Sequence, residues 1–273
     1  MSPLPRPLVE AVDALAVRPE ILVALDFDGV LAPIVLDPDA ARPLPRGRDA
    51  VHALAALPGV HVALVSGRTL ADLRRLADPP PSASLVGSHG AQVADEHGRD
   101  SGAAASLDDA TRDLLARVTA GLQDIADRYD GAYVESKPAG AVFHTRRMTD
   151  RDAVDDASRE AASGPGSLEG VRRTLGKEVV DLSVVDVDKG VALQRLRAAL
   201  GDTPGDVAVL YAGDDVTDEH AFAVLDDAAG DVTVKVGDGA TAARHRVADP
   251  DGAADLLEHL LAARDRAAVT PPG

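Results

Sequence analysis

The sequence predicts an α/β fold, in which a parallel sheet is flanked by helices and interrupted by a smaller α+β segment. Short apolar runs alternate along the chain with stretches of helical periodicity, which is typical of a parallel sheet covered by helices. Between residues 106 and 183 this alternation stops, and helices occur together with a hairpin pattern. We therefore expect a core formed by residues 1–105 and 184–273, and a second domain over residues 106–183.

The expected core strands are aliphatic runs bounded by Gly, Asp, Ser or Pro, which is the pattern of buried strands. They cover residues 22–25, 60–65, 85–86, 207–212 and 232–236. The helical stretches between them cover residues 46–57, 69–76, 189–200, 218–225 and 253–263. This alternation predicts an open sheet with helices on its faces.

The inserted segment has a different order of elements. We expect a helix over 108–129, a hairpin over 133–146, a second helix over 149–162 and further strands within 168–180. Residues 163–167 predict a turn, residues 78–84 a proline-rich surface loop, and residues 269–273 a disordered tail. Helices with antiparallel strands indicate a small α+β domain.

Composition limits the classes of partner. Aromatic residues make up 2% of the 273 residues, so the cores must be packed from aliphatic side chains. The formal net charge of −17 argues against a nucleic acid or an anionic membrane surface as partner, because both would repel the molecule. There is no Cys, which excludes disulfides and thiolate metal sites and fits a reducing compartment. The N-terminal residues lack the apolar stretch of a signal peptide or membrane span, so we expect a soluble, cytoplasmic protein.

Two acids follow the first predicted strand, in Asp26-Phe27-Asp28-Gly29. Carboxylates this close disfavour joint ionisation, and a divalent cation or a shared proton is the usual remedy. The first hypothesis is therefore a metal site that handles phosphate. The alternative is that Asp26 simply ends a strand and begins a turn.

Further polar clusters follow other strands at the edge where parallel sheets bind ligands. Ser66-Gly67-Arg68 follows the second strand, and its donors could hold a phosphoryl oxygen or form only a helix N-cap. Residues 213–219 hold four acids after a buried strand, as in a Mg²⁺ site with oxygen ligands, although a solvated charge run would look similar. Lys189 opens a predicted helix, where a cation opposes the helix dipole. It either neutralises phosphate and carboxylate charge or is a surface lysine.

In chain order, Asp-x-Asp, Ser-Gly-Arg, Lys and Gly-Asp-Asp resemble the four motifs of the haloacid dehalogenase superfamily of phosphohydrolases, over residues 21–261. Within that superfamily, residues 213–219 and 25–33 resemble the signatures of trehalose-6-phosphate phosphatases. Residues 87–91, 135–138 and 144–146 point the same way. The resemblance implies a Rossmann-like core with an inserted cap domain of the C2 type, which closes over the site and reads the leaving group.

The resemblance also implies a Mg²⁺-dependent phosphatase that works through an aspartyl-phosphate. Asp26 would attack phosphorus, and Asp28 would protonate the departing sugar oxygen and later take a proton from water. Mg²⁺ would be held by the carboxylates of Asp26 and Asp214 and the main-chain carbonyl of Asp28. Asp215 and Asp218 would orient waters or the lysine of the third motif without binding the ion directly.

Ser66 and Lys189 complete the implied catalytic set with Asp26 and Asp28, because they would stabilise phosphoryl oxygens. The expected substrate-binding residues are Asp26, Phe27, Asp28, Ser66, Gly67, Arg68, His89, Glu135, Lys137, His144, Arg146 and Lys189. The resemblance implies that Glu135 and Lys137 contact the sugar, because the family pattern aligns them with such contacts, and their spacing would place both on one face of a strand. A solvated polar hairpin is the alternative for the inserted residues, and a structural histidine for His89.

The chain departs from the family at residues 181–184, which read Asp-Leu-Ser-Val where many members read Glu-x-Arg-Pro. The lost arginine leaves the sugar preference open. We expect trehalose 6-phosphate as substrate, a phosphorylated disaccharide that is the small-molecule partner. A phosphatase of sucrose phosphate or of mannosyl- or glucosyl-phosphoglycerate is the first alternative, and phosphomutase activity another. A non-catalytic sugar-phosphate sensor would be expected to lack one of the acids. We expect a monomer, with association with a synthase left open.

Overall fold

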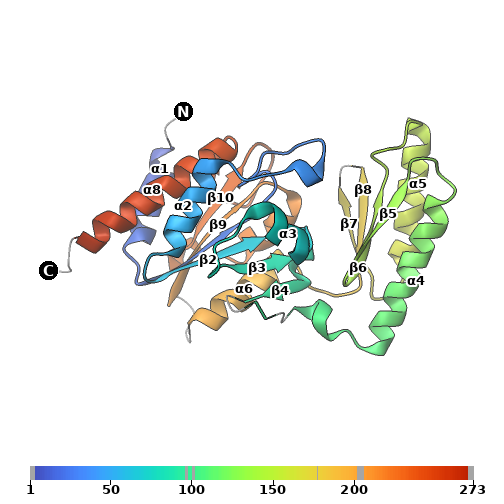
Figure 1. The fold of residues 1–273 in the computed structure, drawn as a ribbon, viewed down its shortest axis with the longest axis horizontal. Helices are drawn as coiled ribbons and strands as arrows, with labels where there is room; N and C mark the ends of the chain where they lie inside the picture. The colour runs from blue at the N-terminus through green and yellow to red at the C-terminus, as the bar shows by residue number, and fades with distance from the viewer. Residues whose placement is uncertain (1–3, 96–97, 100–101, 177, 202–205, 270–273) are drawn as a thin grey trace. The chain divides into compact units, whose positions relative to one another are not determined.

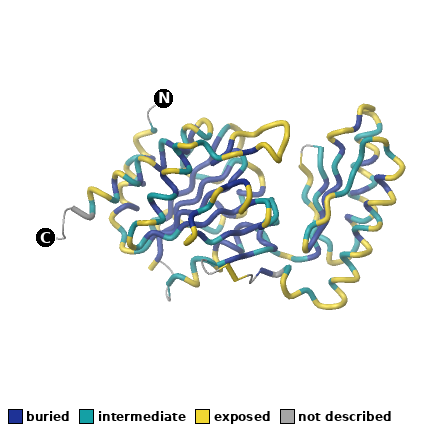
Figure 2. The backbone as a smooth tube through the Cα atoms, in the orientation of Figure 1, coloured by how far each residue is buried: buried dark blue, intermediate teal, exposed yellow. Residues whose placement is uncertain are grey.

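The computed structural model describes residues 4–95, 98–99, 102–176, 178–201 and 206–269, and the chain forms two compact units (Figure 1). The first unit combines Met1–Ser101 with Asp188–Gly273, and the second is Gly102–Val187. Figure 2 shows that each unit encloses buried strands of its own. The core thus consists of two chain segments that are far apart in sequence.

A seven-stranded sheet, in the order β11-β10-β9-β1-β2-β3-β4, forms the centre of the first unit. Its strands are β1 (Glu20–Leu25), β2 (Val60–Val65), β3 (Ser84–Gly87), β4 (Gln92–Ala94), β9 (Val207–Gly213), β10 (Val232–Val236) and β11 (His245–Val247). Neighbouring strands pair in parallel, except β3 and β4, which are antiparallel. Strand β1 lies between β2 and β9, where the strand order reverses, and ligands bind at such a switch point.

Helices cover both faces of this sheet, which confirms the predicted α/β class. One face packs against α1 (Arg6–Ala16), α2 (Pro45–Ala55), α3 (Leu70–Ala77) and α8 (Pro250–Val269). The other packs against α6 (Lys189–Leu200) and α7 (Glu219–Ala223). Short 3₁₀ turns lie at Pro38–Ala40, Ser88–Gly90, Val216–Asp218 and Asp227–Ala229.

Helix α1 is unexpected, because its N-terminal region is rich in proline. Pro7 lies in the first turn of the helix, where a missing N–H costs no hydrogen bond. Leu8, Val12 and Leu15 share one buried face of the helix. Helix α8 extends beyond the expected residues 253–263 and includes Val269, and residues 270–273 of the expected tail lie outside the described residues.

The second unit is an antiparallel sheet with helices on one face. Its strands, in the order β5-β6-β8-β7, are β5 (Tyr133–Lys137), β6 (Gly140–His144), β8 (Val179–Ser183) and β7 (Arg172–Gly176). Its helices are α4 (Asp109–Ala126) and α5 (Arg151–Ser163), and 3₁₀ turns lie at Ala103–Ser106 and Pro165–Ser167. Phe143 and Leu182 point toward the helices and form the centre of this core with Val118 and Leu122. The opposite face of the sheet carries polar side chains.

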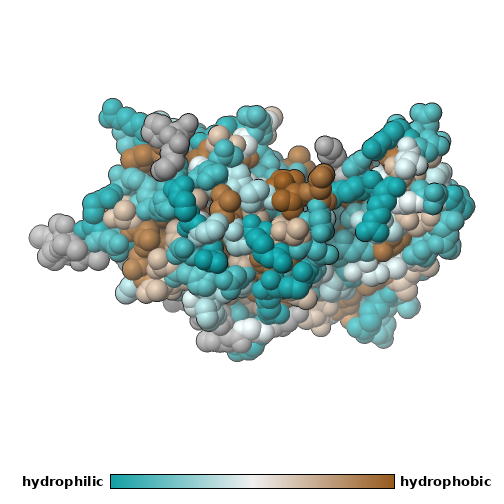
Figure 3. Space-filling view, turned by 45° about the horizontal axis from the view of Figure 1, so that its top comes forward, coloured by the Kyte–Doolittle hydropathy of each residue, from teal (hydrophilic) through white to brown (hydrophobic). Residues whose placement is uncertain are grey.

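Figure 3 shows the distribution of polar and apolar residues on one face of the molecule. The face drawn in Figure 3 is mostly hydrophilic, with separate apolar patches, as the high content of charged residues leads one to expect. Among the described helices, none combines the length and the hydrophobicity that a membrane span requires.

Candidate active site

Three strands of the core deliver polar residues to the carboxyl edge of the sheet. Asp26 follows β1, Ser66 follows β2 and Asp214 follows β9. The N–H of Asp26 donates to the carbonyl oxygen of Ala212 at 2.9 Å, so pairing between β1 and β9 continues into the first motif. The N–H of Ser66 likewise donates to Val86 at 2.8 Å. The parallel sheet thus fixes the main chain from which these side chains project.

Asp26, Asp214 and Asp218 form an acidic cluster, and Lys189 binds two of its members. The Nζ of Lys189 is 2.6 Å from Oδ2 of Asp26 and 2.7 Å from Oδ1 of Asp218. The three side chains are 2%, 7% and 0% exposed, so these ion pairs are screened little by solvent. Burial alone would lower the pKa of Lys189, but the two carboxylates raise it above its ordinary value. These ion pairs explain a cation at the start of α6, where the helix dipole is unfavourable to it.

Asp218 uses both of its oxygens to hold this cluster together. Oδ1 accepts hydrogen bonds from Lys189 and, at 2.7 Å, from the hydroxyl of Tyr211. Oδ2 accepts from the main-chain N–H groups of Asp214 and Asp215, each at 2.9 Å. Burial tends to raise the pKa of Asp218, but the Lys189 charge and these hydrogen bonds bring it below its ordinary value. Asp218 therefore stays ionised and positions the loop, while the side chain of Asp215 is exposed.

At Asp26 and Asp214, burial and neighbouring negative charges outweigh the effect of nearby positive charges. Burial raises the pKa of Asp26 well above its ordinary value, and nearby Asp218 and Asp214 add to the effect, although Lys189 opposes it. Burial and the charge of Asp218 raise the pKa of Asp214 to about 7. One carboxylate oxygen from each of Asp26, Asp214 and Asp218 lies within 4.8 Å of the other two. A divalent cation among hard oxygen ligands would relieve this repulsion.

Gly29 makes room for the carboxylate of Asp214. Its φ of +75° belongs to the left-handed region, and a Cβ built there would lie 2.0 Å from Oδ2 of Asp214. The turn is closed by a hydrogen bond from the N–H of Gly29 to the carbonyl oxygen of Ala32, at 2.8 Å. A glycine after Asp28 is therefore required both by the backbone and by the approach of the acid from β9.

Asp28 is paired with Arg68 from the second motif. Nε and Nη2 of Arg68 donate to the two oxygens of Asp28 at 2.6 and 2.7 Å. The guanidinium also lies over the ring of Phe27, 5.3 Å from its centroid. The structure makes Arg68 the direct partner of Asp28, and the contact of Arg68 with substrate stays a prediction.

Ser66, Gly67 and His89 pack together beside these groups. Ser66 is buried, and its Oγ accepts the N–H of Arg68 at 3.2 Å. The carbonyl oxygen of Ser66 accepts the N–H of His89 at 3.0 Å. A Cβ on Gly67 would lie 2.4 Å from the imidazole of His89, so the ring packs directly on this glycine. These contacts place His89 next to the second motif.

Glu135, Lys137 and His144 share the sheet face that is turned away from α4 and α5, and Arg146 lies in the turn after β6. Lys137 pairs with Asp181 at 2.8 Å, and Glu135 with His144 at 2.9 Å. The rings of His144 and Tyr133 stack at 4.5 Å. Arg146 lies beside Glu178, with 4.0 Å between Nε and Oε2.

Tyr211 and Lys235 belong to the site and were not predicted. Lys235 is 4% exposed, and its Nζ donates to the main-chain carbonyl oxygen of Asp214. Both residues lie inside strands that the sequence predicts as apolar. A charged residue within a fully buried strand such as β10 is the signal that could have identified Lys235.

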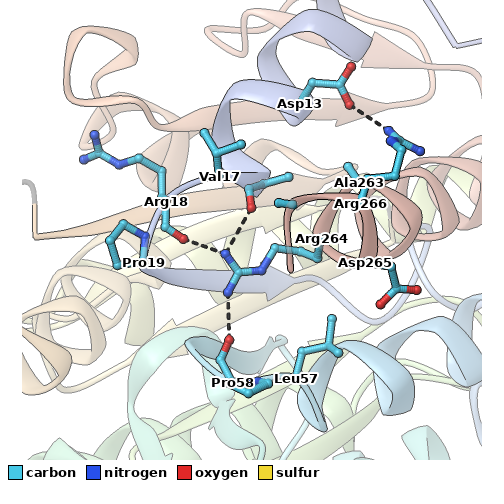
Figure 4. Close-up of a pocket in the computed structure, with 12 residues that line it drawn as sticks. Asp13, Val17, Arg18, Pro19, Leu57, Pro58, Ala263, Arg264, Asp265 and Arg266 are labelled. Carbon is cyan, nitrogen blue, oxygen red and sulfur yellow. Dashed lines mark hydrogen bonds and ion pairs between the residues drawn. The ribbon is translucent and has the colours of Figure 1, made fainter. Parts of the chain in front are cut away.

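A pocket of about 780 Å³ lies near the amino ends of β1 and β2, opposite the carboxyl ends that carry the acidic cluster (Figure 4). It is lined by residues that precede β1 and β2, including Pro19 and Pro58. Arg264 donates from Nη1 to the carbonyl oxygens of Ala16 and Arg18, at 3.1 and 2.5 Å, and from Nη2 to that of Pro58, at 2.8 Å. These bonds join α1, β1 and β2 to α8, and they indicate a structural role for Arg264.

The chain is similar to proteins that act on trehalose phosphate. The trehalose-phosphatase family model matches residues 24–251. A trehalose-phosphate phosphatase of Mycobacterium avium (strain 104) is 36% identical over 200 residues, which cover 71% of this chain and 48% of the relative. The chain thus spans about half the length of the curated relatives it matches.

Solved structures share the fold. The C-terminal domain of Candida albicans trehalose-6-phosphate phosphatase superimposes with a TM-score of 0.80 at 22% identity, covering 96% of this chain and 98% of that one. The C-terminal domain of the Candida albicans trehalose synthase regulatory protein gives 0.71 at 20% identity, with 91% and 96% covered. The family model covers most of the chain, including Asp26 at one end of the match and Asp214 and Asp218 toward the other. We conclude that the chain belongs to the trehalose-phosphatase family.

Proposed function

We propose that this protein is a Mg²⁺-dependent phosphatase that hydrolyses trehalose 6-phosphate to trehalose and phosphate. The observation that carries the proposal is the buried arrangement of Asp26, Lys189 and Asp218, with Asp214 beside it, at the carboxyl edge of the sheet. Hydrolysis of a phosphate monoester is very slow without a catalyst, so it needs a nucleophile, charge neutralisation and a proton donor together. The first two motifs and the acidic cluster supply groups for all three.

Asp26 is the proposed nucleophile. One of its oxygens would form a bond to phosphorus as the bond from phosphorus to the sugar oxygen breaks, which leaves an aspartyl-phosphate. Oδ1 accepts the N–H of Phe27 at 2.6 Å and Oδ2 accepts Lys189, so the orientation of the carboxylate is fixed. Such fixed orientation lowers the entropic part of the barrier.

Asp28 is the proposed acid and base. It would give its proton to the departing sugar oxygen and then take one from the water that attacks the aspartyl-phosphate. Phosphate leaves as the bond from phosphorus to the Asp26 oxygen breaks, and the carboxylate is restored. Arg68 keeps the Asp28 side chain in place, and Ser66 and Lys189 supply donors for phosphoryl oxygens.

The donor set fits a magnesium ion. One carboxylate oxygen each from Asp26 and Asp214 lies within 4.8 Å of the other, and both groups have a raised pKa, which a cation between them would offset. The carboxylates of Asp26 and Asp214 and the main-chain carbonyl of Asp28 would hold the ion, whose charge would offset that of the phosphoryl group. Asp218 would act through Lys189 and the loop, because its oxygens already accept four hydrogen bonds.

The second unit supplies the proposed sugar contacts. Glu135, Lys137, His144 and Arg146 combine charged donors and acceptors, which suit the hydroxyl groups of a disaccharide. Asp181 stands where many members have glutamate, and its carboxylate pairs with Lys137 at 2.8 Å. In this proposal the enzyme acts as a cytoplasmic monomer on a small sugar phosphate.

Phosphate release from a panel of sugar phosphates, with Mg²⁺ and with EDTA, tests the proposal. We expect trehalose 6-phosphate to be the best substrate and turnover to require the cation. Better turnover of sucrose phosphate or of a glycosyl-phosphoglycerate would favour the alternative substrates. Tight binding of trehalose 6-phosphate with no phosphate release would instead identify a sensor, and the C-terminal domain of a regulatory protein shares this fold.

A further inference from the structure

We infer that Lys235 is a positioning residue, whose side chain fixes the main chain of Asp214 so that its carboxylate is held ready for the cation. The parallel register sets Lys235 of β10 level with Gly213 of β9, one residue before Asp214. From there Nζ reaches the carbonyl oxygen of Asp214. The inference rests on the proposed metal site and adds a residue outside the four motifs.

The burial of Lys235 calls for a reason other than stability. It is 4% exposed on a strand whose other residues are Val and Thr, and burying an ammonium group away from water is expensive. Its ammonium group donates to the main-chain carbonyl oxygen of Asp214, in the acidic loop that follows β9. An apolar side chain of similar length would satisfy packing at lower cost, so the charge is best explained by what it does to that loop.

The main chain at Asp214 is held from two directions. Its N–H donates to Oδ2 of Asp218 at 2.9 Å, and its carbonyl oxygen accepts Lys235. Gly29 leaves space for the side chain on the third side. With both peptide groups fixed, the direction of the Asp214 carboxylate is set before any ion binds. Supporting contacts of this kind commonly change metal affinity by about 10- to 100-fold when they are removed.

Direct binding of Mn²⁺ to the full chain, followed by electron paramagnetic resonance, tests this inference without using turnover. We expect Lys235→Met to weaken Mn²⁺ binding by at least about tenfold and Lys235→Arg, which keeps a charged donor, to recover part of the loss. Thr233→Val is the matched control. Thr233 lies on the same face of β10, is equally buried and accepts the N–H of Arg244, away from the acidic loop.

The outcomes separate the two proposals. Failure of the wild type to bind Mn²⁺ would remove the metal site itself, and Asp214→Asn provides the reference for a lost ligand. Wild-type binding that is unchanged in a folded Lys235→Met variant would overturn the role of Lys235 alone. If Lys235→Met does not fold, the Lys235→Arg variant decides the question. An Mn²⁺ affinity and a melting curve that are both unchanged in Lys235→Arg would contradict the positioning role, because that role depends on the geometry of the bond from Lys235 to Asp214.

Discussion

Arg68 grips both carboxylate oxygens of Asp28, at 2.6 and 2.7 Å, and so joins the first motif to the second. The two side chains are 15% and 33% exposed, and the pair combines a planar guanidinium with a planar carboxylate. If Asp28 is the acid and base, Arg68 determines the position and orientation of its carboxylate.

Replacing Arg68 by Lys should therefore reduce turnover. Lysine keeps the charge but cannot form the two parallel bonds, so Asp28 would lose its fixed orientation. We expect kcat for trehalose 6-phosphate to fall by about 10- to 100-fold. The measurement is steady-state phosphate release, with Arg42→Lys as control, because Arg42 bonds to the carbonyl oxygens of Asp39 and Ala41. An unchanged kcat would show that the pairing is dispensable.

Asp26→Asn should abolish turnover and leave the fold intact. Asparagine fills the same space but is not a nucleophile for phosphorus, and Lys189 keeps its partner Asp218. Because the pKa of Asp26 is raised in the folded protein, the ionised carboxylate disfavours folding at neutral pH. The melting temperature of the variant in EDTA should be equal to that of the wild type or higher. A variant that still releases phosphate would refute the assignment of the nucleophile.

The protein without metal should lose stability as the pH rises. The pKa of Asp214 is raised from 3.8 to about 7, so the folded state binds this proton more tightly than the unfolded state, and stability falls between those values. The shift of Asp26 acts in the same direction. Asp218, whose pKa is lowered, loses its contribution only under more acidic conditions. Thermal melting in EDTA should therefore occur at a lower temperature at about pH 8 than at about pH 5.5.

Stabilisation of the folded protein by Mg²⁺ should increase as the pH rises, because Mg²⁺ binds the ionised carboxylates. Its stabilising effect on the melting temperature is expected to grow over the same pH range. Asp214→Asn should flatten both curves. Parallel curves for wild type and Asp214→Asn would contradict the role assigned to this acid.

The positions of the candidate site residues could be predicted because strand ends are visible in the sequence. Asp26, Ser66 and Asp214 each follow an aliphatic run, and the carboxyl ends of parallel strands meet at one edge. Lys189 could be found because a cation at a helix start is unfavourable without a partner. The roles of these residues stay predictions.

Other features depend on three-dimensional contacts that no local pattern encodes. The pairing of Arg68 with Asp28 joins loops 40 residues apart. Tyr211 and Lys235 are hidden in strands that look apolar, since one polar residue hardly changes a short buried run. Helix α1 was missed because its prolines, read as signs of irregular structure, lie at the helix start where they are compatible with it.

Lys137 offers a test of sugar recognition apart from the chemistry. Its Nζ pairs with Asp181 on the polar face of the second unit's sheet. We expect Lys137→Met to raise KM for trehalose 6-phosphate by about tenfold, since charge-assisted bonds to the sugar would be lost. Turnover of p-nitrophenyl phosphate, which has no sugar, should be unchanged. Equal losses with both substrates would argue against a role in sugar recognition.

Gly29 provides a test of the space between the first and fourth motifs. Its substitution by Ala would place a Cβ 2.0 Å from Oδ2 of Asp214 and would strain a residue at φ +75° by about 1–2 kcal/mol. Gly59 is a close match, with φ +69° and a Cβ position 2.0 Å from the carbonyl oxygen of Pro19, but it precedes β2 at the other edge of the sheet. Both variants should therefore melt at lower temperature than the wild type.

Only Gly29→Ala should also lose Mg²⁺ binding and turnover, because only there does the added methyl group displace a proposed ligand. The comparison is made by calorimetric titration with Mg²⁺ at a temperature where both variants are folded. If Gly59→Ala weakens Mg²⁺ binding as much as Gly29→Ala, the effect follows from general destabilisation. The close approach of Asp214 to the first motif would then have no specific part in holding the cation.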